Sequence, residues 1–324
     1  MELPLELRVA IDEKISEINI EQLQKDASNI SLRYRNESGK GNRLLTENSE
    51  AISYSIVRMP ATYSAIYTAL KHTLELYDGE LHTMLDVGAG TGAGSWAATS
   101  LMDLEKITCI EREDAMISIG KYFTKNADLE CLKNATWKKA DLVSDEIKEH
   151  ADLVVCSYVL NELDDAGRMR ALEKLWAATN KVLVIIEPGT PVGFNEIKFL
   201  RKELITLGAS IIAPCPSCKE CTIKNDDWCH ATCRVSRSRL HKLLKNGDVP
   251  YEDEKFSYIA VAKENAEHIG IARVLRHPKI ESGRITVKLC TNEGIVDRVI
   301  TKKDKDTFKL ARKLKCGDYL EYKQ

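Results

Sequence analysis

The fold class follows from one stretch of sequence, Thr83-Met-Leu-Asp-Val-Gly-Ala-Gly-Thr-Gly-Ala-Gly-Ser95. An apolar run from Met84 to Val87 leads directly into four glycines at alternating positions, and a helix-compatible run, Ser95–Leu101, follows. Glycine lets the backbone turn sharply and approach a ligand without a Cβ atom in the way. The stretch therefore predicts a strand, a tight ligand-binding turn and a helix.

Acidic residues end three successive candidate strands, at Asp86, Glu111 and Asp141. The first suits a ligand that carries a cation, such as the α-amino group of S-adenosylmethionine, the second can accept ribose hydroxyls, and the third can accept from an adenine amino group. The alternative is that all three are ordinary helix N-caps. With the loop glycines and the serine that ends the fourth strand, the predicted cofactor-binding set is Asp86, Gly88, Gly90, Gly92, Glu111, Asp141 and Ser157.

Strands and helices alternate between about residues 81 and 263. The predicted strands are Thr83–Val87, Lys106–Ile110, Thr136–Lys139, Ala151–Ser157, Lys181–Glu187 and Phe256–Lys263. The predicted helices are Ser95–Leu101, Ala115–Phe123, Asp165–Ala177 and Phe194–Leu207. This alternation indicates an α/β fold with a doubly wound, mostly parallel sheet. Together with the glycine stretch and Asp86, it predicts a Rossmann-like fold of the S-adenosylmethionine methyltransferase type. Ligands of such a sheet bind at the carboxyl ends of its strands.

The two flanking regions differ from this core. In residues 1–80, apolar side chains from Leu3 to Ile18 recur at helical spacing, a polar loop follows at 36–42, and Pro60 predicts a break in the second helical region. In the tail, short alternating runs predict strands at Ile271–Leu275, Arg284–Cys290, Ile295–Thr301 and Phe308–Leu314. We expect an N-terminal helical region (1–80), a Rossmann-like domain (81–265) with a Cys-rich insertion at about 209–250, and a basic, β-rich C-terminal domain (266–324).

The composition is ordinary for a globular protein, with 44% hydrophobic and 30% charged residues and a net charge of −2. The overall charge does not indicate a nucleic-acid partner, but residues 266–324 hold 14 lysines and arginines against 8 acidic residues. No run of about 18 apolar residues is present, so we expect no membrane span. The charged N-terminus lacks an apolar signal core and predicts a cytoplasmic location. Nothing in the sequence indicates the oligomeric state.

Five of the ten cysteines cluster between Cys215 and Cys233. Without an export signal, this clustering favours metal or iron–sulfur ligation over disulfides. The spacing matches neither a two-knuckle zinc site nor a radical-forming iron–sulfur motif, so both metals stay open. The residues that follow fit either a phosphate-binding surface or a solvated helix face. They include Arg234, Arg237, Arg239, His241, Lys242 and Lys245.

Several local strings together resemble one family. They are Arg58–Tyr63, the glycine stretch, Ser157–Leu163, Glu187–Phe194, the cysteine cluster and Pro250–Tyr258. From about residue 30 onward, the chain is similar to the ribosomal small-subunit methyltransferase-like proteins, which are mitoribosome assembly factors with prokaryotic relatives. The resemblance implies an S-adenosylmethionine fold that associates with the small ribosomal subunit and its rRNA. Arg58–Tyr63 then either covers the cofactor as a lid or serves plain helix packing.

The resemblance also implies a [4Fe–4S] cluster held by four cysteines. The family's spacing falls on Cys215, Cys221 and Cys229, and the fourth ligand matches Cys290. Such a set joins the insertion to the C-terminal region. Cys218 and Cys233 lie outside the pattern and leave an alternative ligand set or a second metal open.

Three functions are compatible with these patterns. The first is an iron–sulfur protein that methylates rRNA of the small ribosomal subunit with S-adenosylmethionine. The second is a non-catalytic assembly factor that binds S-adenosylmethionine and rRNA. The third is a zinc-stabilised methyltransferase for a protein or small molecule. No Asn-Pro-Pro-Tyr motif follows the fourth strand, which favours the second function, and we identify no catalytic residue.

Overall fold

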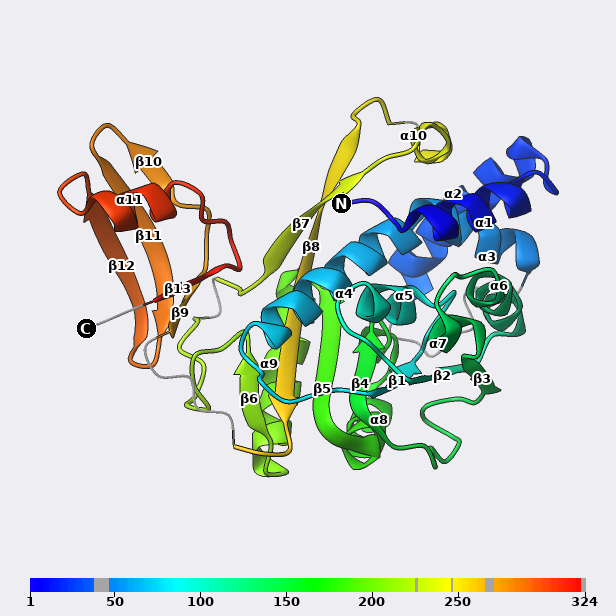
Figure 1. The fold of residues 1–324 in the computed structure, drawn as a ribbon, viewed down its shortest axis with the longest axis horizontal. Helices are drawn as coiled ribbons and strands as arrows, with labels where there is room; N and C mark the ends of the chain where they lie inside the picture. The colour runs from blue at the N-terminus through cyan, green and yellow to red at the C-terminus, as the bar shows by residue number, and fades with distance from the viewer. Residues whose placement is uncertain (38–46, 225–226, 246, 266–270, 322–324) are drawn as a thin grey trace. The chain divides into compact units, whose positions relative to one another are not determined.

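The computed structural model describes residues 1–37, 47–224, 227–245, 247–265 and 271–321 (Figure 1). Most of the polar loop predicted at 36–42 lies outside the described residues. The chain forms two compact units. The first unit comprises Met1–Lys71, Gly79–Ile186 and Cys233–Glu254. The second unit comprises His72–Asp78, Glu187–Thr232 and Lys255–Gln324.

A parallel sheet forms the centre of the first unit, with strand order β3-β2-β1-β4-β5 (Figure 1). Its strands are β1 (Thr83–Val87), β2 (Lys106–Glu111), β3 (Thr136–Lys139), β4 (Ala151–Ser157) and β5 (Thr179–Pro188). The order reverses at β1, where Val87 lies in register with Ile110 of β2 and Cys156 of β4. The carboxyl ends of these three strands therefore meet at one switch point, as in other Rossmann-like methyltransferase folds.

Burial explains why the sequence predicts the bounds of β1 and β4 well. Every residue from Met84 to Val87 in β1 and from Leu153 to Cys156 in β4 is buried. Parallel strands covered on both faces are continuous apolar runs. The edge strand β3 is mostly exposed and ends in two lysines. The predicted bounds of β1, β3 and β4 are confirmed.

Helices of the first unit precede and follow these strands. They are α1 (Leu5–Ile15), α2 (Ile20–Glu37), α3 (Asn48–Val57), α4 (Met59–Leu74), α5 (Ala93–Thr99), α6 (Asp114–Lys125), α7 (Glu130–Lys133), α8 (Asp165–Ala178), α10 (Arg239–Lys245) and the 3-10 turn η1 (Leu160–Glu162). Helix α3 packs against α2 and α6. The break predicted at Pro60 is confirmed at Arg58, between α3 and α4. Proline fits the first turn of α4, where a missing N–H leaves no helical bond unmade.

The second unit contains α9 (Pro191–Thr206), whose N-cap Thr190 accepts a hydrogen bond from Gly193 N. Strand β6 (Ser210–Ala213) pairs antiparallel with β8 (Tyr251–Ala262), which also pairs with β7 (Ala231–Ser236). β7 and β8 each continue from one unit into the other. The segment 209–250 thus contains β6, β7 and α10, none of which our strand and helix predictions included.

A small antiparallel sheet completes the second unit (orange in Figure 1). Its order is β10-β11-β9-β13, with β12 paired to β11. The strands are β9 (Ile271–Val274), β10 (Lys279–Glu281), β11 (Arg284–Thr291), β12 (Gly294–Thr301) and β13 (Tyr319–Glu321). Alternate residues of β11, including Ile285, Val287 and Leu289, are buried in its apolar core.

The strand predicted at Phe308–Leu314 is wrong, because this region forms helix α11 (Lys305–Ala311). Asp304 caps the helix by accepting from Thr307 N. Phe308, Ala311 and Leu314 pack on the core of the small sheet at three-residue spacing, which is one face of a helix. Leu310, which a strand pattern would place inside, is 49% exposed.

Candidate functional site

The glycine loop follows β1 and holds three glycines in the left-handed region. Gly88 has φ +68°, and a Cβ atom there would lie 2.2 Å from Val159 Cγ2, so any other residue would be strained and would displace Val159. Gly90 has φ +56°, and its added Cβ would meet only Met116 Cε, at 3.9 Å. Gly92 caps the start of α5. The loop is therefore packed closely at Gly88 and open at Gly90, where a ligand can approach the backbone.

Asp86 lies beneath this loop and is 1% exposed. Its Oδ2 accepts from Ser95 N at 2.9 Å and from Ser95 Oγ at 3.0 Å. Burial raises the pKa of Asp86 to about 6, although the Ser95 hydrogen bonds oppose this. A Cβ on Gly94 would come within 2.7 Å of the carboxylate. Asp86 thus anchors the first turn of α5, and its role toward a cofactor stays a prediction.

Glu111 ends β2 and joins the loop to the start of α6. One carboxylate oxygen accepts from Gly90 N at 2.8 Å. The other accepts from Arg112 N at 2.8 Å and Glu113 N at 2.9 Å. Burial raises the pKa of Glu111, and the backbone donors oppose it. The carboxylate therefore holds Gly90 in place at the open position of the loop.

Asp141 follows β3 and caps a turn. It accepts from Val143 N at 2.8 Å and Ser144 N at 3.0 Å. Burial acts to raise its pKa, but these backbone donors and Arg112, 3.9 Å away, lower it. Within the chain, Asp141 therefore acts as a cap for the turn that follows it, as in the alternative considered above.

A carboxylate that the sequence analysis did not single out, Glu162, lies in the turn after β4. Arg112 lies 3.6 Å from Glu162 and 3.3 Å from Glu113. Burial raises the pKa of Glu162 to about 7, with Glu111 and Glu113 adding to the effect and Arg112 opposing it. The sequence signal that could have identified Glu162 as a site residue was its position within Ser157–Leu163, one of the strings that carry the family resemblance. Ser157 itself is half-buried at the end of β4.

Tyr158 has φ +57°, the left-handed region that non-glycine residues seldom adopt. Its hydroxyl donates to Glu254 at 3.0 Å, and Arg58 lies 3.4 Å from the same carboxylate. Arg58 begins the segment Arg58–Tyr63, which the sequence left open as a lid or as plain helix packing, and Met59 and Ala61 in it are fully buried. Thr91 of the glycine loop donates to Met59 Sδ at 3.3 Å. This segment packs as a helix and contacts the loop directly.

The basic residues after the cysteine cluster are largely paired within the first unit. Arg234 lies 2.8 Å from Asp253. Arg237 and Lys245 lie 2.7 and 3.1 Å from Glu252. Their charges are therefore neutralised by β8, which weakens the interpretation of this segment as a phosphate-binding surface.

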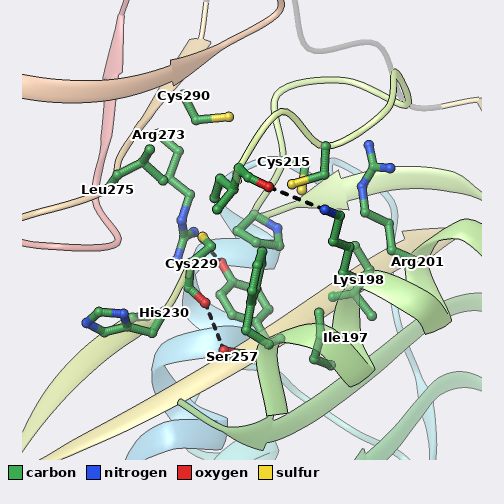
Figure 2. Close-up of a pocket in the computed structure, with 17 residues that line it drawn as sticks. Ile197, Lys198, Arg201, Cys215, Cys229, His230, Ser257, Arg273, Leu275 and Cys290 are labelled. Atoms are coloured by element: carbon green, nitrogen blue, oxygen red, sulfur yellow. Dashed lines mark hydrogen bonds between the residues drawn. The ribbon is translucent and has the colours of Figure 1, made fainter. Parts of the chain in front are cut away.

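The second unit brings four cysteines to one cavity, with about 550 Å³ of empty space including the part open to solvent (Figure 2). Cys215 and Cys221 lie in the segment after β6, Cys229 precedes β7, and Cys290 belongs to β11. Burial raises the pKa of Cys215 to about 11 and that of Cys290 to about 12, and the neighbouring cysteines add to both shifts. The thiols of Cys215 and Cys290 are therefore protonated at neutral pH.

The other two clustered cysteines do not line this cavity. Cys218 is exposed, and Cys233 is buried in β7, where burial and Glu254 raise its pKa to about 12. Within the described ranges, no three Cys, His, Asp or Glu side chains stand in an arrangement that could hold a metal ion. The four lining thiols thus share a cavity without the close convergence of a formed metal site.

A family model described as mitochondrial small ribosomal subunit Rsm22 matches residues 48–321. The chain belongs to the Rsm22 family. The family resemblance of the sequence is thereby confirmed. This Rsm22-family chain is also 23% identical over 292 residues to the ribosome assembly protein METTL17, mitochondrial, of Homo sapiens. That match covers 83% of the chain but only 62% of METTL17, so the chain spans less than two thirds of this relative.

Solved methyltransferases are similar to the Rsm22-family chain at low identity. Magnesium protoporphyrin IX methyltransferase of Synechocystis PCC 6803, with bound S-adenosylmethionine, has a TM-score of 0.42, 13% identity and coverage of 76% of this chain and 98% of its own. N-methyltransferase NodS of Bradyrhizobium japonicum WM9 has a TM-score of 0.42, 12% identity and coverage of 65% and 91%. Separately, none of the helices described in the Rsm22-family chain has the length and apolar character needed to cross a bilayer.

Proposed function

We propose that this Rsm22-family chain binds S-adenosylmethionine and an iron–sulfur cluster and acts on the small ribosomal subunit, by methylating rRNA, by assisting assembly, or both. One observation carries the proposal. Cys215, Cys221 and Cys229 line the same cavity as Cys290, which comes from a different part of the sequence. The family match supplies the ribosomal context.

The glycine loop supports the S-adenosylmethionine half of the proposal. Gly90 leaves open space beside Glu111, at the carboxyl ends of β1 and β2, where adenosyl ligands of this fold bind. Each carboxylate oxygen has more than one acceptor site, so Glu111 would accept ribose hydroxyls in addition to its backbone donors. Asp86 would act through the loop or a water molecule, because it is buried. The bound cofactor would supply the transferable methyl group.

The chemistry of the cavity supports the cluster half of the proposal. Four cysteines are the donor set of a [4Fe–4S] cluster and also of structural zinc, which is the alternative. Either group would join the segment after β6 to strand β11 within the second unit. We propose that the cluster is structural, with Cys215, Cys221, Cys229 and Cys290 as its ligands.

Exposed cations around α11 support the RNA part of the proposal. Among the described residues, these lysines have no carboxylate partner, unlike the paired arginines near β8. They include Lys302, Lys303, Lys305, Lys309 and Lys313. Unpaired surface cations bind phosphate backbones without sequence preference.

A second candidate, a non-catalytic assembly factor, is favoured by the residues that follow β4. Tyr158 donates to Glu254 and Glu162 lies beside Arg112, so both side chains are engaged within the chain. Tritiated methyl incorporation into small-subunit particles from cells that lack the protein separates the two candidates. Labelling above background supports methylation, whereas stoichiometric particle binding without labelling supports the assembly role.

Two binding measurements test the cofactors. Calorimetric titration of the purified chain with S-adenosylmethionine should show binding, and an absence of heat at millimolar ligand would remove that half of the proposal. Anaerobic reconstitution with iron and sulfide should give a brown protein with broad absorption at about 400 nm. A colourless protein that holds one zinc ion and does not bind RNA would instead favour a zinc-stabilised methyltransferase for another substrate.

The cytoplasmic location predicted from the sequence is also part of this proposal. The relative METTL17 is named as mitochondrial, so the location needs its own test. Fractionation of cells that express the tagged chain should place it with cytoplasmic ribosomal particles. Recovery in an organelle fraction would contradict this prediction without affecting the two sites.

A further inference from the structure

The cavity lined by the four cysteines contains cations and, among its described lining residues, no aspartate or glutamate. Arg201 and Lys198 come from α9, and Arg273 comes from β9 (Figure 2). Lys198 Nζ donates to Ile223 O at 3.3 Å, which ties α9 to the cysteine-bearing segment. Buried cations ordinarily pair with carboxylates, because an unpaired buried charge is costly. Among the described lining residues, no carboxylate therefore balances the positive charge of this cavity.

Arg273 is the more deeply buried of the two arginines, at 2% exposed. Its Nη1 donates to Tyr258 Oη at 3.2 Å, and this neutral phenol also lies 3.3 Å from His72 Nδ1. Its Nε–H is buried without a hydrogen-bond partner, and no described carboxylate pairs with the guanidinium. Figure 2 shows the guanidinium beside Cys229. Arg273 thus presents an unused donor and an uncompensated charge next to a thiol.

Arg201 shows the same pattern and is 6% exposed. Its Nη2 donates to Ser217 O at 2.8 Å and to Lys219 O at 2.5 Å, in the segment that carries Cys215 and Cys221. Its Nε–H is also buried without a partner, and no described carboxylate pairs with it. Arg201 therefore orders the cysteine-bearing segment while keeping its own charge unbalanced.

Four thiolates outweigh the positive charge of Zn²⁺ or of an iron–sulfur core, so a tetrathiolate centre is anionic. We infer that Arg201 and Arg273 are the counterions of an anionic metal–thiolate centre in this cavity, and that their Nε–H groups donate hydrogen bonds to its sulfur atoms. This inference rests on the proposed function, because it takes the four cysteines as ligands. Groups of this kind hold a centre in place and tune its reduction potential.

Iron release and reduction potential of the reconstituted protein test the inference. Arg273→Met and Arg201→Met should each release iron to a chelator about 10- to 100-fold faster than the parent. Each should also lower the reduction potential, because removing a cation disfavours the more negative reduced centre. Arg273→Lys keeps the charge and should keep the potential near that of the parent. Lys202→Met, an exposed change next to Arg201 on α9, is the control and should alter neither quantity.

Melting of the metal-free protein separates a counterion from a packing residue. Arg273→Met should leave the metal-free protein as stable as the parent or more stable, because an unpaired buried charge is gone, while destabilising the loaded protein. Unchanged iron release and potential in both methionine variants would overturn the inference. A folded parent that takes up neither cluster nor zinc overturns the proposed function instead. If Arg273→Met does not fold, Arg201→Met and Arg273→Lys decide by the same measurements.

Discussion

The glycine-loop site and the cysteine cavity differ in how their polar groups are satisfied. In the loop site, Asp86, Glu111 and Asp141 each accept at least two hydrogen bonds from within the chain. In the cavity, thiols with raised pKa values lie among cations, and the Nε–H groups of Arg201 and Arg273 have no hydrogen-bond partner in the part of the chain that the structure describes. The loop site is thus complete as folded, whereas the cavity holds groups that a bound centre would satisfy.

This difference predicts different responses to ligand loss. A loop braced by its own hydrogen bonds keeps its geometry without a cofactor, so cofactor binding adds stability only by mass action. A cavity completed by a metal centre couples binding to local folding. Removal of the metal should therefore loosen the second unit more than removal of S-adenosylmethionine loosens the first.

The largest effect should come from Cys290→Ser, which removes the one cysteine contributed by the small sheet. Loss of a residue that supports a metal ligand lowers metal affinity about 10- to 100-fold. Because Cys290 is a proposed ligand itself, we expect its loss to lower iron affinity by more than this. The melting difference between loaded and metal-free protein should largely disappear. Iron analysis and thermal melting measure both. Cys218→Ser is the matched control, because Cys218 is exposed outside the cavity and should behave like the parent. Equal iron content in both variants would contradict the ligand set.

Gly90→Ala should have the next largest effect, at the other site. A side chain at φ +56° costs about 1–2 kcal/mol, and its methyl group enters the open position of the loop. We expect S-adenosylmethionine affinity to fall about tenfold or more, measured by calorimetry. Gly208→Ala carries similar strain, at φ +87° with nothing within 4 Å of the added Cβ, but lies away from the loop. If both variants bind the cofactor equally well, Gly90 does not face the ligand.

In the first unit, Glu162 should make the stability of the protein depend on pH. Its folded pKa of about 7 exceeds the ordinary 4.5, so its contribution to stability is present at acid pH and is lost as pH rises through 7. Glu162→Gln should therefore gain stability relative to the parent between pH 4.5 and 8, on the order of 1–3 kcal/mol. Denaturant unfolding across this range measures the trend.

Glu149 provides a control of opposite sign. The hydrogen bond from Lys138 holds the pKa of Glu149 below its ordinary value, so its contribution is present at neutral pH and is lost as pH falls. Glu149→Gln should accordingly lose a small amount of stability at neutral pH and approach the parent at acid pH. A parallel trend in the two variants would show that Glu162 is not held protonated by its surroundings.

The smallest effect should come from single surface cations. Lys303→Ala should weaken RNA binding a few-fold and reduce the salt slope of binding by about one, because one phosphate contact is lost. Arg234→Ala should change neither, since Arg234 is already paired with Asp253. Filter binding at several salt concentrations measures both. If the two variants lose RNA affinity equally, ion pairing with β8 does not prevent Arg234 from binding RNA.

Local pattern predicted much of the first unit. The bounds of β1 and β4 match the structure because continuous apolar runs between turn residues occur in buried parallel strands. The bounds of the mostly exposed edge strand β3 also match. The residues of the glycine loop follow from the same stretch. Glu162 was missed because its raised pKa depends on burial and on Glu111 and Glu113, which lie elsewhere in the sequence.

The second unit contains a segment whose secondary structure the local sequence pattern did not predict correctly. The alternation at Phe308–Leu314 also satisfies a helix, and packing against the small sheet selected the helix. In the first unit, the ion pairs of Arg234 and Arg237 with β8 likewise depend on strand register. Register is set by long-range pairing, to which a short window of sequence is insensitive.

The sequence alone determined the Rossmann-like core, the glycine loop and the thiol-rich segment, because each depends on neighbours within about ten residues. The family resemblance implied that Cys290 joins Cys215, and the tertiary structure places both at one cavity. Only the tertiary structure placed two guanidinium groups there that no described carboxylate balances. Charge balance in a buried space depends on every chain segment that lines it. The charge balance of the cavity is therefore defined only once distant segments of the chain have packed together.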